Sequence, residues 1–245
     1  MLERNKIYNG DCLELMPQIA TGSIDMILCD LPYGTTKCKW DIAIPFDNLW
    51  SEYKRLIKPN GAIVLFGTEP FSSYLRLSNI DNYKYDWTWD KITARGHLVA
   101  KHRPMQQTET ISVFGYDKIN YYPQMIDRPK NKFKTSKEFK RTDIIGGNGK
   151  TEYKIYDTWY PKNIISISNA NSSNDKKGHP TQKPIPLFEY LINTYSKEGD
   201  TVLDNCIGSG TTAIACKQTG RNFIGIEKEQ KYFDIANKRL NETLL

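Results

Sequence analysis

The chain has 245 residues, of which 39% are hydrophobic and 25% are charged, and its formal net charge is +6. This length excludes a mini-protein and is sufficient for one α/β domain with an insertion or for two small domains. No apolar run approaches the roughly 18 residues of a membrane span, and the first residues lack the apolar core of a signal peptide, so we expect a cytoplasmic protein.

Segments rich in branched and aromatic residues alternate with amphipathic helical segments along most of the chain. In chain order, the pattern predicts a strand over 24–30, a helix over 46–57, a strand over 62–67, a helix over 70–79, strands over 85–90 and 109–115, a helix over 185–196, a strand over 201–206, a helix over 211–219, a strand over 222–227 and a helix over 230–241. This alternation predicts an α/β fold with a doubly wound, mainly parallel sheet.

Residues 116–178 interrupt this alternation and carry the excess positive charge. They hold 13 Lys and Arg but only 7 Asp and Glu, whereas the other residues balance at 21 and 21. Polar stretches rich in glycine and asparagine also occur in this segment. We therefore expect an insertion at the edge of the sheet and divide the chain at 1–115, 116–178 and 179–245.

The five cysteines are scattered along the chain. They form no CxxC pair and have no histidine partners at metal-ligand spacing. The sequence therefore predicts reduced thiols and no metal site.

The segment TVLDNCIGSGTTAIA, residues 201–215, has the order strand, glycine turn, helix. Gly208 and Gly210 allow the backbone to approach a ligand closely. The following strand ends at Glu227, 23 residues after Asp204, where nucleoside-binding folds place the acid that binds ribose hydroxyls. The longer GxGxxG turn that suits a pyrophosphate is absent, so S-adenosylmethionine fits better than a nicotinamide dinucleotide.

The chain ends shortly after this cofactor-binding unit, so the remaining strands of a wound sheet must come from the N-terminal part. Four motifs then occur in order: DLPYG at 30–34, HPTQKP at 179–184, LDNCIGSGTT at 203–212 and IGIEKEQKYFDIA at 224–236. Together they resemble the permuted, or beta-group, amino-methyltransferases of DNA, over about residues 5–115 and 178–241. The resemblance implies a circularly permuted Rossmann-like methyltransferase with a target-recognition insertion.

By this resemblance, the catalytic motif is Asp30, Leu31, Pro32 and Tyr33. The Asp30 carboxylate and the Leu31 carbonyl would accept hydrogens from the exocyclic amine of a base and favour a nitrogen with an available lone pair. Tyr33 would stack on a base that has left the duplex. Leu31 replaces the first proline of the family motif, and Cys206 replaces a phenylalanine of the cofactor motif.

The resemblance also assigns cofactor contacts. Asp11 corresponds to the acid that receives the adenine amine, although a helix cap explains it equally well, and Lys183 could attract the methionine carboxylate. The full expected cofactor set is Asp11, Asp30, His179, Thr181, Lys183, Asp204, Cys206, Gly208, Ser209, Gly210, Thr211 and Glu227.

Two basic segments are the expected DNA contacts. One follows the catalytic strand and is the candidate for a lid over DNA; the other interleaves basic residues with aromatics inside the insertion. A solvated loop and a solvated charged face are the alternatives. The candidate residues are Lys37, Lys39, Trp40, Arg128, Lys130, Lys132, Lys134, Lys137, Lys140 and Arg141.

The sequence thus favours an enzyme that moves a methyl group from S-adenosylmethionine to the N6 amine of a flipped adenine in double-stranded DNA. The alternatives are an N4-cytosine methyltransferase and a DNA-binding homologue that has lost turnover. A homodimer and a cognate restriction endonuclease are the further partners considered. Methylation of a cytosine ring carbon is disfavoured, because no Pro-Cys pair occurs in the chain.

Overall fold

The computed structural model describes residues 1–34, 43–132, 134–139, 151–169 and 182–243. The chain divides into two units, one of residues 1–122 and 163–245 and the other of residues 123–162. The second unit lies within the segment 116–178 that the sequence marks as an insertion.

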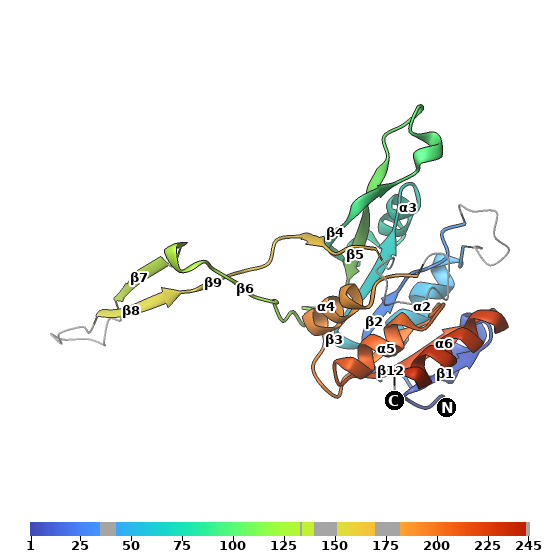
Figure 1. Cartoon of the computed structure of the whole chain (residues 1–245). Helices are drawn as coiled ribbons and strands as arrows, with labels where there is room; N and C mark the ends of the chain where they lie inside the picture. The colour runs from blue at the N-terminus through green and yellow to red at the C-terminus, as the bar shows by residue number, and fades with distance from the viewer. Residues whose placement is uncertain (35–42, 133, 140–150, 170–181, 244–245) are drawn as a thin grey trace. The chain divides into compact units, whose positions relative to one another are not determined.

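One eight-stranded sheet organises the first unit (Figure 1). Its strands, in spatial order, are β1 (Lys6–Asn9), β12 (Asn222–Glu227), β11 (Thr201–Asp204), β2 (Ile24–Cys29), β3 (Ile57–Gly67), β5 (Gln106–Phe114), β4 (Tyr83–Arg95) and β10 (Ile164–Ser166). Neighbouring strands are parallel except on both sides of β5, which is antiparallel to β3 and to β4. The expected doubly wound α/β fold is confirmed.

The strand order also displays the circular permutation. β1, near the start of the chain, lies beside β12, near its end, with Lys6 in register with Ile224. The two halves of the sheet meet where β11 pairs with β2. All six expected strands and all five expected helices are present, and the sequence missed the edge strands β1 and β10, which have four and three residues.

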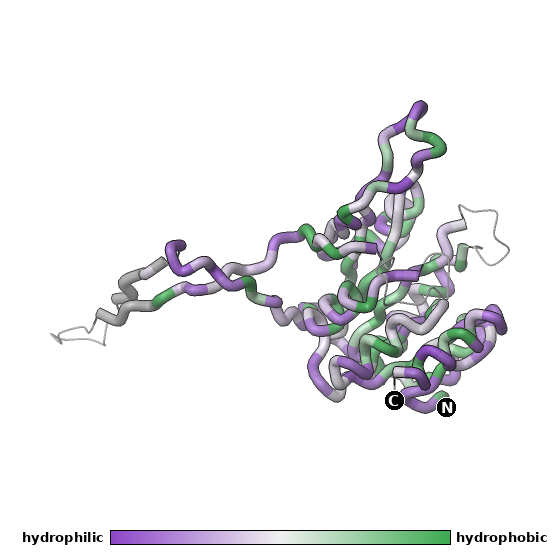
Figure 2. The backbone as a smooth tube through the Cα atoms, viewed as in Figure 1, coloured by the Kyte–Doolittle hydropathy of each residue, from purple (hydrophilic) through white to green (hydrophobic). Residues whose placement is uncertain are grey.

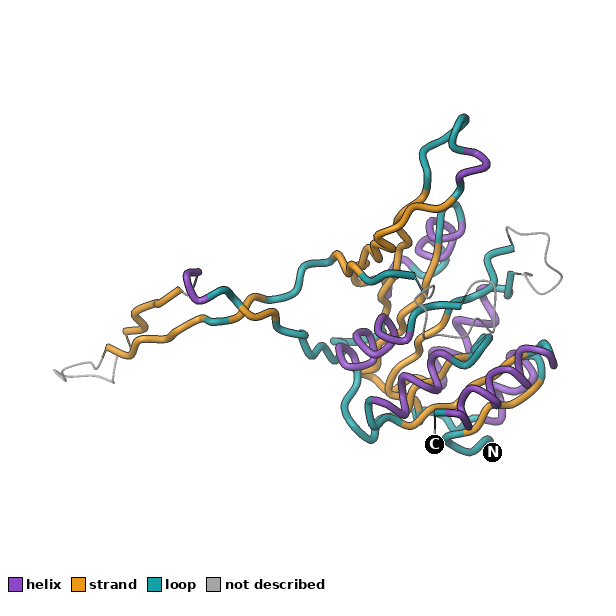
Figure 3. Tube along the Cα trace, in the orientation of Figure 1, coloured by secondary structure: helices purple, strands orange, loops and turns teal. Residues whose placement is uncertain are grey.

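Helices cover both faces of the sheet, as Figure 3 shows. On one face α4 (Ile185–Tyr195), α5 (Thr211–Gln218) and α6 (Gln230–Glu242) share an apolar cluster with Met26 and Leu28; on the other, α1 (Cys12–Leu15), α2 (Phe46–Leu56) and α3 (Phe71–Leu77) share a second cluster with Ile27 and Cys29. This division follows from the period of two along β2, which sends successive side chains to opposite faces. Figure 2 shows the hydrophobic residues gathered along these central strands.

The second unit consists of two small antiparallel pairs. β6 (Ile126–Asp127) pairs with β9 (Thr158–Trp159), and β7 (Lys134–Phe139) pairs with β8 (Thr151–Tyr156). Arg128 joins the segments, because its Nε donates to the Thr158 carbonyl at 2.7 Å and its guanidinium lies 5.4 Å from the Trp159 ring centre. No helix among the described residues is long and apolar enough to cross a membrane.

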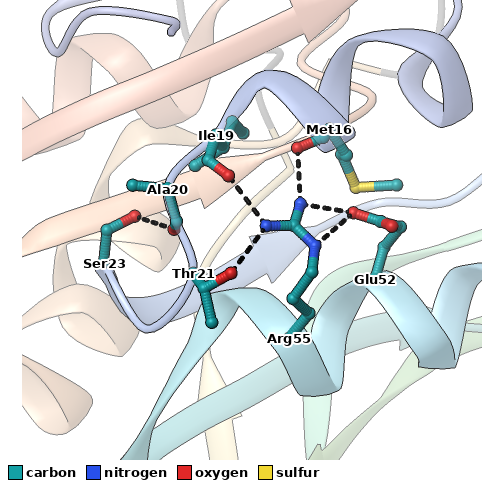
Figure 4. A network of polar contacts seen from close by, with 7 residues as sticks. All are labelled: Met16, Ile19, Ala20, Thr21, Ser23, Glu52 and Arg55. Carbon is teal, nitrogen blue, oxygen red and sulfur yellow. Dashed lines mark hydrogen bonds and ion pairs between the residues drawn. The ribbon is translucent and has the colours of Figure 1, made fainter.

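Arg55 at the end of α2 holds the chain segment that precedes β2 (Figure 4). Its guanidinium donates to the Ile19 and Met16 carbonyls, both at 2.8 Å, and pairs with Glu52 at 2.6 Å. The Ile19 carbonyl follows the short helical turn Met16–Gln18, and the Met16 carbonyl also accepts from the Ile19 N–H at 2.9 Å. Arg55 therefore gives the first carbonyl a partner and the second a further donor.

We expect Arg55→Ala to lower the free energy of unfolding by about 2 kcal/mol, because it removes several charge-assisted hydrogen bonds to partly buried acceptors. Urea denaturation monitored by circular dichroism measures the change. The control is Arg76→Ala, which removes a surface pair with Glu69 and should change stability by less than about 0.5 kcal/mol. Equal effects in the two variants would contradict a structural role for the Arg55 contacts.

Candidate active site

The candidate site lies at the carboxyl ends of β11, β12 and β2. β11 continues toward β12 on one side of the sheet, whereas β2 continues toward β3 on the other, so the winding reverses between β11 and β2. Ligands of open α/β sheets bind outside the strand ends at such a switch point. Three acids stand there, Asp30 directly after β2, Asp204 at the end of β11 and Glu227 at the end of β12.

Asp30 is held from two directions. Its Oδ1 accepts a hydrogen bond from the Tyr33 hydroxyl at 2.7 Å, and its Oδ2 contacts the Lys183 ammonium at 2.6 Å. Each carboxylate oxygen has two acceptor sites, so both can still accept from a further donor. The structure therefore places an oriented carboxylate where the resemblance predicts the catalytic acid.

Lys183 belongs to a chain of four charges in which the two lysines are buried and the two carboxylates are partly buried. Besides Asp30, its Nζ lies 3.4 Å from Oε2 of Glu109, and Oε1 of Glu109 lies 2.8 Å from Nζ of Lys91. Burial disfavours the charged forms, but the opposite charges outweigh it, so the pKa of Lys183 is raised and the pKa of Glu109 is lowered. Two cations and two anions thus neutralise one another beside the site.

Of the other members of the predicted catalytic motif, Leu31 is buried, whereas Pro32 and Tyr33 are partly buried. The Leu31 side chain is buried in the apolar cluster that covers the α1–α3 face of the sheet. The Tyr33 ring stacks on Phe71 with 4.8 Å between ring centres. Burial and the nearby Asp30 raise the pKa of the Tyr33 hydroxyl well above its ordinary value, so it remains a hydrogen-bond donor. Leucine is therefore accommodated where the family has proline.

The glycine loop between β11 and α5 is fixed on one side and open on the other. Gly208 and Gly210 have φ values of +55° and +84°, in the left-handed region that favours glycine. A Cβ at Gly210 would lie 3.0 Å from the Ala236 Cβ of α6, whereas a Cβ at Gly208 would meet nothing within 4 Å. Gly210 therefore allows close helix packing, and Gly208 borders open space beside the loop.

Glu227 contacts this loop, and Asp11 follows β1, the strand beside β12. The Glu227 carboxylate accepts from the backbone N–H groups of Gly208 and Glu229, both at 2.8 Å, and burial raises its pKa. Asp11 caps α1 by accepting from the Leu13 N–H at 2.9 Å, and it pairs with Lys228 at 3.0 Å. The cap that the sequence offered as one explanation of Asp11 is thus present, and its role toward a cofactor stays a prediction.

Asp204 lies beneath the loop and not on its surface. Its buried carboxylate accepts from the Cys206 N–H at 3.1 Å and from the Thr212 hydroxyl. Burial raises its pKa to about 7, against these hydrogen bonds. Asp204 therefore joins both ends of the glycine loop, and its contact with a cofactor stays a prediction.

Cys206 stands among small and polar groups at the position where the family has phenylalanine. The Asn205 amide donates to its sulfur at 3.6 Å, and the buried Tyr53 hydroxyl donates to the Asn205 amide oxygen at 2.6 Å. Burial is the main cause that raises the pKa of the nearby Cys29 thiol to about 12. These thiols are protonated at neutral pH.

Gln182 and Lys183, from the HPTQKP motif, are hydrogen-bonded to the glycine loop and the start of α5. The Ser209 hydroxyl donates to the Gln182 amide oxygen at 3.2 Å, and the Thr211 hydroxyl donates to the Lys183 carbonyl at 3.3 Å. From α6, Arg239 donates to the Ser209 carbonyl at 2.6 Å. The Lys183 ammonium contacts Asp30 and Glu109, so its expected attraction for a cofactor carboxylate stays a prediction.

Several predicted residues fall elsewhere. His179, Thr181, Lys37, Lys39, Trp40, Lys140 and Arg141 lie outside the described residues. Lys130 and Lys132 are exposed in the second unit, and Lys134 and Lys137 belong to β7. Their DNA contacts stay predictions, as do those of Arg128.

Sequence reasoning missed Glu109, Lys91 and Phe71. The acid at 109 opens the strand segment ETISVF, which has no other charged residue, and an ionisable group directed into a core requires a partner. This isolated acid in a strand is the one local signal in the sequence that distinguishes Glu109. Nothing in the sequence around Phe71 distinguishes it from an ordinary core residue.

The groups around the loop fit a nucleoside cofactor. Open space borders Gly208, a buried carboxylate stands at the end of β12, and the carboxylate of Asp11 stands near the end of β1. Among the described residues, no three His, Cys, Asp or Glu side chains gather in a metal-binding arrangement. Fold and site together define the class of S-adenosylmethionine-dependent methyltransferases.

Comparison with known proteins agrees with this class. Residues 24–238 match the N6/N4 family described as DNA methylase, and the chain belongs to that family. The Type II methyltransferase M1.MboII of Moraxella bovis is 32% identical over 99% of this chain and 98% of its own length. M.HinfI of Haemophilus influenzae, also a Type II methyltransferase, is 30% identical over 97% of this chain and 68% of its own length.

Solved structures show the same relationship. The crystal structure of the M1.HpyAVI–SAM complex superposes with a TM-score of 0.66 at 29% identity, covering 96% of this chain and 98% of that one. The PvuII DNA methyltransferase, which is cytosine-N4-specific, superposes with a TM-score of 0.67 over 99% of this chain and 92% of its own. At 16% identity it shares the fold alone. The chain is a DNA methyltransferase that uses S-adenosylmethionine.

We expect Glu227→Gln and Asp11→Asn each to weaken S-adenosylmethionine binding by about 1.5 to 3 kcal/mol, because each removes the charge from one carboxylate beside the loop. Asparagine retains the helix cap at position 11, which keeps the fold intact. Isothermal titration calorimetry measures the affinity, with Glu14→Gln in the first turn of α1 as the control. Wild-type affinity in both test variants would place the cofactor elsewhere.

The raised pKa of Asp204 predicts a pH-dependent contribution to stability. The folded protein binds this proton more tightly than the unfolded chain, so the contribution is complete below pH 3.8 and is lost as the pH rises to about 7. Asp204→Asn removes the titration and keeps an acceptor oxygen. Relative to this variant, the wild type should lose on the order of 4 kcal/mol across that range.

Urea denaturation at several pH values measures this difference. Asp200→Asn, which changes an exposed turn acid that caps Lys197, is the control and should follow the wild type. Parallel pH profiles for wild type and Asp204→Asn would show that Asp204 stays ionised in the folded state.

Proposed function

We propose that this protein methylates the N6 amine of an adenine within a specific sequence of double-stranded DNA. The observation that carries the proposal is the Asp30 carboxylate, oriented by Tyr33 and Lys183 at the switch point of the sheet. When bound, S-adenosylmethionine supplies an electrophilic methyl group. The residues of this chain then have to bring the amine into line and stabilise the charge that develops on it.

Asp30 and the Leu31 carbonyl accept the two hydrogens of the amine in this proposal. The amine of a base is a weak nucleophile because its lone pair is delocalised into the ring. Two acceptors favour a pyramidal nitrogen, and the carboxylate stabilises the positive charge that forms on the nitrogen in the transition state. No covalent nucleophile is required.

The four charges of Asp30, Lys183, Glu109 and Lys91 support this role of Asp30. Lys183 alone would neutralise Asp30 and weaken it as an acceptor, but Glu109 shares the Lys183 charge. The Asp30 carboxylate therefore retains much of its attraction for a developing cation. Tyr33 presents one ring face to Phe71, and the other face is the surface on which a flipped base would stack.

Adenine is favoured over cytosine by the combination of Asp30 and Tyr33, which resembles the adenine enzymes, and by the larger stacking face of a purine. N4-cytosine methylation is the second candidate, because the cytosine-N4-specific PvuII enzyme has the same fold. A homologue that binds DNA without turnover is the third, suggested by Leu31 and Cys206.

The relatives named Type II methyltransferases support a role in restriction and modification. We propose a cognate restriction endonuclease that cuts the same DNA sequence when it is unmethylated.

We also propose that the protein assembles as a homodimer. Sedimentation velocity measures the mass of the assembly in solution.

The test is to incubate unmethylated bacterial DNA with the protein and S-adenosylmethionine, digest the DNA to nucleosides and identify the methylated one by mass spectrometry. We expect N6-methyladenine. Asp30→Asn should lower kcat by at least about 100-fold, because the amide removes the charged acceptor.

Tyr33→Phe is the matched control, since it retains the ring and removes only the hydrogen bond to Asp30. Its kcat should fall far less. N4-methylcytosine as the main product would replace the substrate assignment, and unchanged turnover by Asp30→Asn would remove Asp30 from the chemistry. No product from the wild type would favour the non-catalytic homologue.

A further inference from the structure

The hairpin between β4 and β5 extends into an arm of residues 91–108 that differs in charge from the rest of the first unit. The arm contains four Lys and Arg, two of the three histidines of the chain, and no Asp or Glu. Apart from Lys91 at its base, its basic residues Arg95, Lys101 and Arg103 are exposed and form no ion pair with any described residue. They therefore carry uncompensated positive charge.

The arm leaves the sheet at the same edge as Asp30. β4 runs in the direction of β2 and β3, since it is antiparallel to β5 and β5 is antiparallel to β3. The last pair of β3 with β5 is Gly67 with Thr110, but β4 and β5 continue to the pair of Arg95 with Gln106. The two strands thus project about 13 Å past the end of β3, before a short helical turn at the tip (Figures 1 and 3).

The base of the arm joins the catalytic network. Lys91 is the first residue of the arm, and its ion pair with Glu109 continues through Lys183 to Asp30. The Asp90 carboxylate beside it accepts from the Gln107 amide at 2.8 Å. The arm is therefore anchored next to the site that the target base must enter.

The tip of the arm is apolar although it is exposed. In the turn at the tip, Leu98 is 100% exposed and Val99 is 36% exposed. A solvated basic arm has no need of an exposed leucine. An apolar side chain among cations is suited to a polyanion that also presents apolar surface, and base edges or a base step provide such a surface.

We propose that residues 91–108 form a DNA-binding arm, separate in sequence from the basic segment of residues 123–162. Arg95, Lys101 and Arg103 bind backbone phosphates beside the flipped base, and Leu98 lies against the neighbouring bases. This inference rests on DNA as the substrate. It adds a contact surface to the assigned motifs, and it leaves the chemistry at Asp30 unchanged.

The first test compares two charge reversals of equal size. Lys101→Glu with Arg103→Glu alters the arm, and Lys231→Glu with Lys238→Glu alters exposed lysines of α6. Affinity for a fluorescein-labelled random-sequence duplex is measured by anisotropy between about 50 and 200 mM salt. Both variants change the net charge equally, so the difference between them isolates local contacts.

We expect the arm variant to lose at least tenfold more affinity than the α6 variant. The slope of log K against log salt should be shallower by about two units, because two phosphate contacts are lost. Affinity for S-adenosylmethionine should remain at the wild-type value in both, which shows that each variant is folded. Equal affinities and slopes in the two variants would overturn the proposal.

The second test separates the apolar tip from the charges. Leu98→Ser should weaken DNA binding about tenfold with the salt slope unchanged, since no charge is altered. Leu77→Ser, at an exposed leucine of α3, is the control and should bind DNA as the wild type does. If Leu98→Ser matches this control, the assigned role of Leu98 is overturned.

The third measurement distinguishes DNA from a second copy of the chain. Sedimentation velocity without DNA should give the same mass for the wild type and the arm variants. A change of mass combined with an unchanged salt slope would make the arm a contact between copies and overturn the proposal. Absence of methyl transfer by the wild type would instead reject the proposed function, whatever the arm does.

Discussion

The ion pair between Lys183 and Asp30 joins the two halves of the permuted core at the candidate active site. The residues are 153 positions apart, and their charged atoms lie 2.6 Å apart in a largely buried setting. A charge removed from water requires a partner, and the loss of one partner leaves the other at a cost of several kcal/mol. Glu109 and Lys91 extend the pair to a balanced set of four charges. The site geometry therefore depends on the whole sheet being assembled.

The glycine loop is fixed from three elements before any ligand is bound. Glu227 holds the Gly208 N–H, Asp204 holds the Cys206 N–H and the Thr212 hydroxyl, and α6 contributes the Arg239 contact with Ser209. Groups fixed in this way need little reorganisation when charge develops, which is how an enzyme stabilises a transition state more than a ground state. The same contacts explain why Asp204 is buried.

Positive charge is concentrated in two parts of the chain, one long segment and one short arm. A count over long segments places the excess of Lys and Arg over Asp and Glu at 116–178. The arm at 91–108 is also positively charged, but acids elsewhere in the first unit cancel its charge in such a count. Only the register of β4 with β5 shows that these basic residues leave the sheet together, at the edge where Asp30 lies. A short window without acids, KITARGHLVAKHR, was the available signal.

The sequence by itself determined the α/β class, the positions of the main strands and helices, the location of Asp30 and Glu227 at strand ends and that of Gly208 in the turn after a strand. These features are local, because periodicity and turn residues act within about ten positions. The tertiary structure alone decided which side chains face Asp30. The sequence predicts a cofactor carboxylate as a partner of Lys183, which stays a prediction. The contacts of Lys183 with Asp30 and Glu109 come from strands and segments that are distant in sequence. Such pairings follow from strand order and the need to neutralise buried charge, and a single sequence states neither.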